Sequence, residues 1–269
     1  MNNFISILIL VLSLVIGNSS YSSEFNKGMD AFSNGDFPTA LDKFKPLVEK
    51  GDDRAQYILG MMYYDGTGVS RNIKETIRLL KLSAEQGNVD AQYNLGIFYI
   101  KGDGVQRNPE ESIQWLKLAA KQDHGNSQYN LGMIYRRGDD GKKSPKKAFK
   151  LLKLASDKNI KYALTNLGWM YYLGEGTSKD TKEGIRLLRL SADQIDPFAF
   201  LYLGIIYAQG DGVPKNNVYA YMMSNISYGL GVKNASKTLD FLEGKMTKLE
   251  INDATEMTEE CLKKNFKGC

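Results

Sequence analysis

The stretch Ala55-Gln56-Tyr57-Ile58-Leu59-Gly60 decides the fold, because it returns at a fixed interval along the chain. It comes back as Ala91-Gln92-Tyr93-Asn94-Leu95-Gly96 and as Ser127-Gln128-Tyr129-Asn130-Leu131-Gly132, each copy 36 residues after the one before. Two more copies start at Ala163 and Ala199, with Leu167-Gly168 and Leu203-Gly204 in register. Five copies in register predict a tandem repeat with the bounds 55–90, 91–126, 127–162, 163–198 and 199–234.

Each copy predicts two helices separated by glycines. Leu59 and Tyr63 share one face of a first helix, and the same pair recurs in every copy, which predicts a buried stripe. The second helix carries apolar residues at helical spacing, as in Ile77, Leu80 and Ala84. Between them, glycine pairs such as Gly66-Thr67-Gly68 end the first helix, because glycine readily adopts the left-handed conformation.

Glycine also occurs inside each first helix, at Gly60 and its four equivalents. It costs about 1 kcal/mol relative to alanine there, so we expect a close helix contact to offset that cost. A single hairpin cannot cover its apolar face, whereas stacked hairpins form one continuous core. The repeats therefore predict an all-α solenoid.

The pattern Ala-x-Tyr-x-Leu-Gly-x-x-Tyr, followed by Gly-x-Gly-Val and by a helix ending in Ala-Ala before a Gly-Asn turn, resembles the Sel-one-like repeat. This repeat is a relative of the tetratricopeptide repeat. The resemblance covers residues 55 to about 234 and implies a right-handed α-α superhelical solenoid of helical hairpins. Two copies depart from the pattern and are expected to differ locally: the third has Asp139-Asp140-Gly141 and the fifth has Ser227-Tyr228.

The segments on either side of the repeats are predicted to be caps. Residues 23–54 indicate a shorter tetratricopeptide-type hairpin turned at Gly35-Asp36, and residues 235–269 alternate apolar and charged groups at helical spacing. Polar-faced end helices keep a solenoid from associating end to end, so we expect a monomer. The two cysteines, Cys261 and Cys269, are predicted to form one local disulfide if the chain is exported.

The first 22 residues are predicted to be a secretory signal peptide. Residues 4–16 are apolar apart from two serines, and no charged side chain precedes Glu24. This apolar run is shorter than the roughly 20 residues needed to span a bilayer, which favours a cleaved signal over a transmembrane anchor. The expected location is the periplasm or the exterior of the cell.

Charge and composition disfavour several classes of function. The 35 basic and 31 acidic residues are mostly interspersed and give a net charge of +4, which does not favour nucleic acid as a partner. His124 is the only histidine and lies in a turn between repeats, so no zinc ligand set can be assembled. The Gly-x-Gly elements follow helices, whereas a phosphate-binding loop follows a strand. We therefore expect no enzyme, no metal and no cofactor.

In tetratricopeptide-like stacks the first helix of each hairpin lines the concave surface, and the resemblance implies the same here. The expected inward positions are unusually aromatic and apolar for a surface, which suits recognition of a protein or peptide. Residues that differ between neighbouring copies are the stronger candidates: Tyr64, Arg136, Arg137, Trp169 and Tyr172. Tyr93 and Tyr129 are weaker candidates, because they occupy a framework position that equally suits hairpin packing.

A basic run is the other surface of interest. Six lysines occur between Lys142 and Lys153 and lead into a helix. They indicate either a solvated helix face or an anchor for an acidic partner, and the lack of interleaved aromatic residues disfavours single-stranded nucleic acid.

The sequence thus favours an exported, non-enzymatic scaffold that binds a protein or peptide, in contact with a host cell or in envelope assembly. A peptidoglycan-associated modulator that holds a cell-wall enzyme is the alternative, and a hydrolase is a remote third.

Overall fold

The structure is a computed structural model that describes residues 23–266. Over this range it is composed of helices joined by turns and loops, with no strand, as the all-α prediction requires. The helices form two compact units that divide between His124 and Gly125, a division that the sequence analysis did not anticipate. The predicted signal peptide lies outside the described residues.

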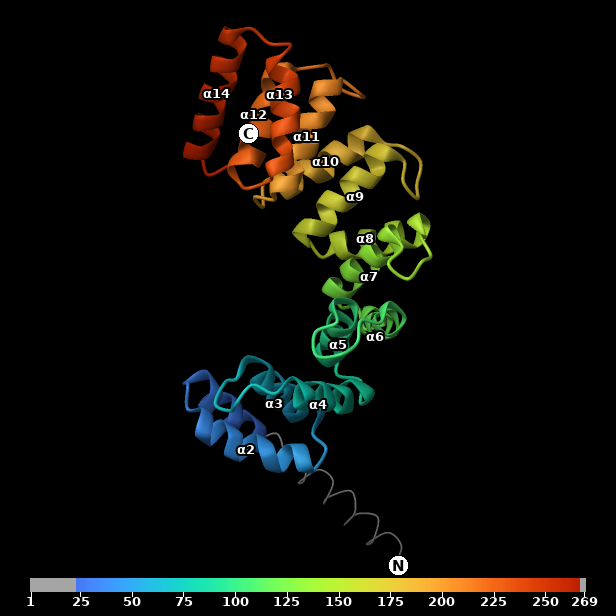
Figure 1. Cartoon of the computed structure of the whole chain (residues 1–269), viewed down its shortest axis with the longest axis vertical. Coiled ribbons are helices and arrows are strands. Elements are labelled where there is room, and N and C mark those ends of the chain that lie inside the picture. The colour runs from blue at the N-terminus through green and yellow to red at the C-terminus, as the bar shows by residue number, and fades with distance from the viewer. Residues whose placement is uncertain (1–22, 267–269) are drawn as a thin grey trace, which may run out of the picture. The chain divides into compact units, whose positions relative to one another are not determined.

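The first unit contains the N-terminal hairpin and the first two repeats (Figure 1). Its helices are a segment over residues 23–33, α2 (Phe37–Glu49), α3 (Asp53–Asp65), α4 (Ile73–Glu85), α5 (Val89–Lys101) and α6 (Pro109–Lys121). α3 packs on α4 and α5 packs on α6, so each predicted repeat is one helical hairpin. The residues from 23 to 49 form the expected shorter hairpin, and Gly35 at its turn has a φ of 76°.

The second unit contains the other three repeats and the C-terminal helices. Its helices are α7 (Gly125–Arg137), α8 (Pro145–Asp157), α9 (Lys161–Leu173), α10 (Thr181–Ala192), α11 (Pro197–Gln209), α12 (Asn217–Gly229), η1 (Lys233–Ala235), α13 (Ser236–Glu243) and α14 (Lys248–Lys263). α7 packs on α8, α9 on α10 and α11 on α12. The hairpins therefore recur in this unit as they do in the first.

A backbone hydrogen bond closes the loop between the two helices of every repeat. The N–H of Asn72, just before α4, donates to the carbonyl oxygen of Tyr63 in α3 (2.8 Å), while the Asn72 side chain accepts from the N–H of Glu75. An asparagine side chain is among the best helix N-caps because it satisfies a free N–H of the first turn. The same backbone bond recurs in the other repeats, from Asn108, Ser144, Asp180 and Asn216.

Two glycines in each loop have different roles. The first, such as Gly66 with φ 74°, ends the first helix in the left-handed conformation. The second lies against the preceding repeat: a Cβ on Gly104 would come within 1.8 Å of Ile73 Cγ2 in α4. The third repeat has Asp140 at this second position, and its left-handed residue is Gly141 instead. The predicted local difference in this loop is therefore confirmed.

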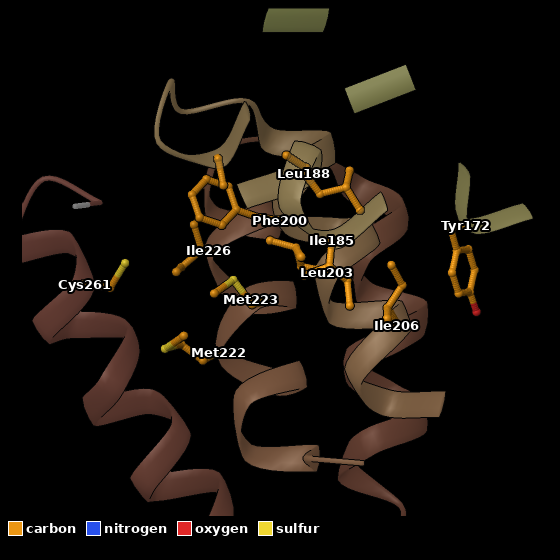
Figure 2. Packing of buried hydrophobic residues seen from close by; sticks show 12 residues of the cluster. Tyr172, Ile185, Leu188, Phe200, Leu203, Ile206, Met222, Met223, Ile226 and Cys261 are labelled. Atoms are coloured by element: carbon orange, nitrogen blue, oxygen red, sulfur yellow. The ribbon is translucent and has the colours of Figure 1, made fainter. Parts of the chain in front are cut away.

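The predicted stripe of leucines is the core of the repeats. Leu59, Leu95, Leu131, Leu167 and Leu203 are all buried. The paired tyrosines follow this prediction only in part, because Tyr99 and Tyr135 are buried while the other three are half-buried. Buried side chains of the second helices complete the core; Figure 2 shows Leu188 of α10 beside Phe200 and Leu203 of α11.

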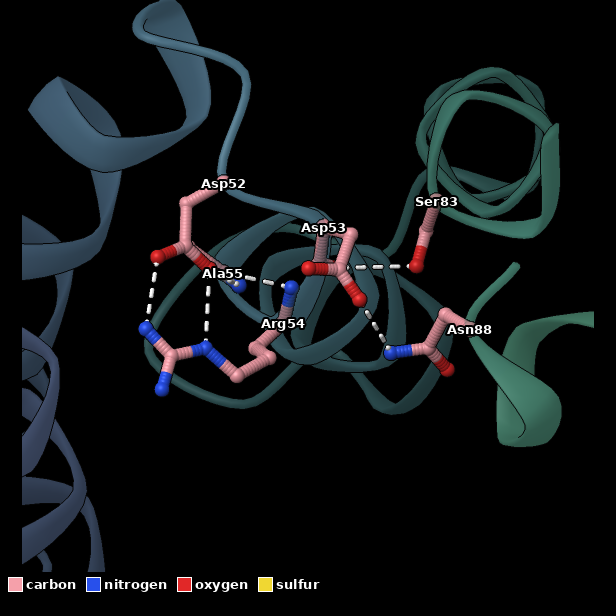
Figure 3. A network of polar contacts seen from close by, with 6 residues as sticks. All are labelled: Asp52, Asp53, Arg54, Ala55, Ser83 and Asn88. Carbon is pink, nitrogen blue, oxygen red and sulfur yellow. Dashed lines mark hydrogen bonds and ion pairs between the residues drawn. The ribbon is translucent and has the colours of Figure 1, made fainter. Parts of the chain in front are cut away.

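A polar contact ties the start of the hairpin to its end in three of the five repeats, and Figure 3 shows it in the first. The hydroxyl of Ser83 in α4 donates to the carbonyl oxygen of Asp53 at the start of α3 (2.7 Å), and Asn88 Nδ2 donates to Asp53 Oδ2 (3.0 Å). Because Asn88 is the N-cap of α5, the Asp53 carboxylate also joins one repeat to the next. The serine bond recurs from Ser191 to Lys161 and from Ser227 to Pro197.

The C-terminal helices cover the last repeat. α14 packs against α12, and Figure 1 shows α12, α13 and α14 as neighbours. Met222 and Ile226 of α12 are consequently buried, whereas Arg186 and Leu190 at the equivalent positions of α10 are exposed. Cys261 of α14 is buried beside them. Cys269 lies outside the described residues, so the Cys261–Cys269 disulfide stays a prediction.

The glycine within each first helix lies at a close helix contact, as predicted. A Cβ on Gly96 of α5 would lie 2.5 Å from Leu116 Cγ in α6. Gly96→Leu should therefore lower the free energy of unfolding by about 1–3 kcal/mol despite the gain in helix propensity, because overpacking forces neighbouring side chains to move. Urea denaturation followed by circular dichroism measures the change. Gly229→Ala is the control, because an added Cβ there meets open space; equal losses for the two variants would rule out the close contact as the cause.

Candidate functional site

The predicted partner-binding residues are divided between the two units. In the first unit, the Tyr64 hydroxyl donates to Asp103 Oδ2 (3.1 Å), which raises the pKa of Tyr64, and its ring meets Phe98 edge to face at 5.1 Å. The Tyr93 ring lies 4.9 Å from the ring of His124. Both tyrosines are half-buried, Tyr64 against the next repeat and Tyr93 against His124 of its own repeat, so each contributes to packing and presents only part of its ring.

The two arginines of the second unit have internal acidic partners. Arg136 Nε donates to Glu175 Oε2 (2.9 Å) and Nη1 donates to Asn166 Oδ1 (2.8 Å), with little of either charged side chain exposed. Arg137 pairs with Asp139 in the loop that follows α7 and stays exposed. Arg136 therefore joins α7 to α9, and its charge is already balanced within the fold.

Trp169 lies in a stack of three aromatic rings. Its indole is 4.2 Å from the Tyr202 ring, nearly parallel to it, and 4.9 Å from the Tyr172 ring. Tyr172 is only 5% exposed and bonds to Gln209 through its hydroxyl. The expectation that Tyr172 is a surface group is therefore wrong, because the next first helix, α11, covers it. Trp169 is half-buried and packs against the core of the last repeats.

The first helices of the second unit carry other aromatic rings that are well exposed. Tyr162 and Phe198, equivalent positions near the starts of α9 and α11, are 48% and 47% exposed. The Tyr129 ring lies 6.4 Å from that of Tyr162, and burial raises the pKa values of Tyr129 and Tyr202. The charges of Arg136 and Asp196 affect the pKa values of both tyrosines, so the two side chains lie in the same electrostatic environment. We define the aromatic face as Tyr129, Tyr162, Trp169, Phe198 and Tyr202.

The lysine run lies in the loop before α8 and along that helix. All six of its side chains are exposed, and none of them is in an ion pair within residues 23–266. Lys147 places its ammonium group 5.2 Å from the centroid of the Tyr135 ring. The run is therefore an exposed basic surface, separate in sequence from the rings of the aromatic face.

His124, the one histidine, packs among protein groups. Its Nε2 is 4.0 Å from Asp90 Oδ1, and burial lowers the pKa of His124 because it disfavours the charged imidazolium. Over the described residues, no group of three His, Cys, Asp or Glu side chains comes together as a metal site would require. None of the helices in this range is both long and apolar enough to cross a membrane.

Comparison with known protein families identifies the repeat. A family model described as the Sel1 repeat matches residues 53–88, 89–124, 125–160, 161–196 and 199–232. The chain belongs to the Sel1 repeat family. The matched Sel1 repeats start two residues before the predicted bounds in four of the five copies, at the first residues of α3, α5, α7 and α9. Sel1 repeats commonly mediate protein–protein interaction, and Sel1 repeat proteins are generally scaffolds rather than enzymes.

Solved structures of other Sel1 repeat proteins have a similar fold. A Sel1 repeat protein from Oxalobacter formigenes is 27% identical, with a TM-score of 0.73 over 80% of this chain and 86% of that one. A protective antigen present in uropathogenic Escherichia coli strains is 24% identical, with a TM-score of 0.62; the match covers 90% of this chain and 61% of the antigen, less than two thirds of its length. No curated protein matches the chain.

Sequence reasoning missed three members of the aromatic face, namely Tyr162, Phe198 and Tyr202. Comparison of the Sel1 repeats column by column could have found them. Tyr202 stands where the second, third and fourth repeats have asparagine, and Tyr162 and Phe198 stand where the first three repeats have Arg54, Asp90 and Asn126. Only the last two repeats carry aromatic residues in this second column.

Proposed function

We propose that this Sel1 repeat protein is an exported, non-enzymatic scaffold that binds a protein or peptide on its aromatic face. The observation that carries the proposal is the pair of half-exposed rings, Tyr162 and Phe198, beside the stacked rings of Trp169 and Tyr202. Large rigid rings give much contact area at low cost in conformational entropy, and binding hot spots are enriched in tyrosine and tryptophan.

The exposed rings favour a partner segment with apolar side chains. Arg136 and Glu175 neutralise each other beside the face, while the Lys161 ammonium group lies 5.1 Å from the centroid of the Tyr162 ring. Asn166, between Tyr162 and Trp169 on α9, uses its amide to donate to the Tyr162 carbonyl oxygen and to accept from Arg136. The partner should therefore gain affinity from apolar side chains that lie between the exposed rings.

The double variant Tyr162→Ala/Phe198→Ala should bind the partner about thirtyfold more weakly, which corresponds to roughly 2 kcal/mol. Its melting temperature should hardly change, because exposed side chains contribute little to stability. A partner captured from envelope extract by crosslinking mass spectrometry would be titrated against both proteins by calorimetry.

Phe241→Ala is the matched control, because Phe241 is 51% exposed on α13, away from the first helices. Equal affinities for the double variant and the wild-type protein would contradict binding on the aromatic face. A loss on Lys147→Glu in the lysine run would then identify that basic surface as the site.

Export is tested by the mass of the mature protein. Protein recovered from outside the cytoplasm should lack roughly its first 22 residues, as signal-peptide cleavage requires. Without reductant its mass should be about 2 Da lower if Cys261 and Cys269 are joined. An intact Met1 terminus together with two free thiols would contradict export.

A further inference from the structure

A cavity opens on the side of the second unit formed by its second helices. It has a volume of about 560 Å³ and lies among α10, α11, α12 and Phe266. A second cavity of about 620 Å³ adjoins it, since both are lined by Arg189, Asp193 and Tyr207. These volumes fall in the range of small-molecule sites. We call the first cavity the Arg189 pocket, lined by Arg189, Asp193, Phe200, Tyr207, Tyr219 and Phe266 among others.

The base of the Arg189 pocket is apolar and firmly packed. Phe200, Leu203 and Met223 are each no more than 1% exposed, and Figure 2 shows the three side chains together where α11 faces α12. The rings of Tyr207 and Tyr219 meet edge to face at 4.6 Å. A rigid aromatic base of this kind accepts an aromatic or large aliphatic group.

The rim of the pocket carries one charge of each sign. Arg189 and Asp193 both extend from the last turn of α10 and are exposed. Arg189 Nη2 donates to the Tyr207 hydroxyl (2.7 Å), which holds the guanidinium at the phenol oxygen of that ring. Arg189 also forms a hydrogen bond with Tyr219. Within residues 23–266 Arg189 forms no ion pair, so its positive charge is not balanced by a carboxylate there.

The first two repeats together contain the equivalent arrangement, with a carboxylate in place of Tyr219. Lys81, Tyr99 and Glu111 are the equivalents of Arg189, Tyr207 and Tyr219. Lys81 lies over the Tyr99 ring at 5.6 Å, and a hydrogen bond with Tyr99 raises the pKa of Lys81, with a smaller contribution from the charge of Glu111. In the fifth repeat tyrosine replaces this glutamate, which removes the internal carboxylate and adds a ring to the base.

We infer that the Arg189 pocket binds an amino acid with an aromatic or large apolar side chain, either free or as the last residue of a peptide. Arg189 takes its carboxylate in the place that Glu111 occupies in the second repeat, and the Tyr207 and Tyr219 rings take its side chain. Asp193 faces the amino group of the free amino acid, or the amide N–H of the peptide. Burial raises the pKa of Tyr219 to about 12, so its phenol stays neutral and does not repel the ligand.

This inference is independent of the proposed function. The Arg189 pocket is formed by second helices and by the outer side of α11, whereas the aromatic face belongs to the first helices. Loss of one site should therefore leave binding at the other unchanged, and each can fail without the other.

The test is calorimetric titration of the full chain with four probes: acetyl-glycyl-glycyl-phenylalanine, its C-terminal amide, the same peptide ending in alanine, and free phenylalanine. The acid should bind at least about tenfold more tightly than the amide and the alanine peptide, because each of these lacks one of the two recognised groups. Tighter binding of free phenylalanine identifies an amino-acid site, and tighter binding of the peptide identifies a site for peptide C-termini. Equal binding of the acid and the amide, or no binding of any probe at about 10 mM, would overturn the inference.

Two variants connect the binding to this pocket. Tyr219→Glu restores the residue found at this position in three other repeats and should reduce affinity about tenfold or more, because the new carboxylate competes for Arg189. Arg189→Met should do the same without disturbing the core, since Arg189 is exposed. Lys81→Met, the equivalent change in the first repeat, should leave affinity unchanged. Unchanged affinity in a folded Arg189→Met protein would overturn the assignment.

Discussion

Replacing Gly176 by alanine is expected to lower the free energy of unfolding by about 2–5 kcal/mol. Gly176 has a φ of 77°, and a Cβ there would lie 2.3 Å from the carbonyl oxygen of Pro145 at the start of α8. That oxygen belongs to the backbone, so no change of rotamer can relieve the clash. The loop between α9 and α10 would have to move away from the preceding hairpin, and urea denaturation followed by circular dichroism would measure the loss.

Gly141→Ala separates the conformational cost from the packing cost. Gly141 has a φ of 78°, almost the same as Gly176, yet an added Cβ meets no atom within 4 Å. Its replacement should lower the free energy of unfolding by only about 1–2 kcal/mol, which is the strain of an alanine in the left-handed conformation. Equal losses at the two positions would show that contact with the preceding hairpin adds nothing to stability.

Leu167→Ala should cost about 2–5 kcal/mol, because Leu167 is 2% exposed in α9 and its truncation leaves a cavity in the core. The loss should extend beyond the fourth repeat, since each hairpin of a linear stack is stabilised by its neighbours. Hydrogen exchange followed by mass spectrometry should therefore show faster exchange in α10 and α11 as well as in α9.

The matched control is Leu173→Ala in the same helix, where the leucine is 51% exposed. It should change the free energy of unfolding by no more than about 0.5 kcal/mol. Similar losses for the two leucines, or faster exchange confined to α9 in the Leu167 variant, would contradict a core that runs from one repeat to the next.

The candidate site was only partly predictable. Trp169 was identified because it breaks the repeat pattern, and it does lie on the first-helix face. Tyr172 breaks the pattern as well, yet it is buried, because Gln209 of α11 bonds to its hydroxyl and Trp169 stacks on its ring. Departure from a repeat pattern indicates that a residue is special, but it does not distinguish an exposed ring from one covered by the next hairpin.

The sequence alone determined the repeat, its hairpins and its core. Leu59 and its equivalents recur because every hairpin presents the same face to its neighbour, and the loop glycines recur because each loop needs a left-handed residue at the same point. Contacts of this kind are local or recur at a constant sequence separation, so they can be predicted from a periodic sequence.

Only the tertiary structure decided which side chains are available to a ligand. Tyr162 and Phe198 are exposed, and Arg136 is paired with Glu175. Arg189 contacts Tyr207 and Tyr219 and has no acidic partner within residues 23–266. The exposure and pairing of a side chain depend on residues about 30 or more positions away, which meet it only when hairpins stack. The sequence of a single repeat does not specify these contacts, so which residues form each surface follows from the stacked fold.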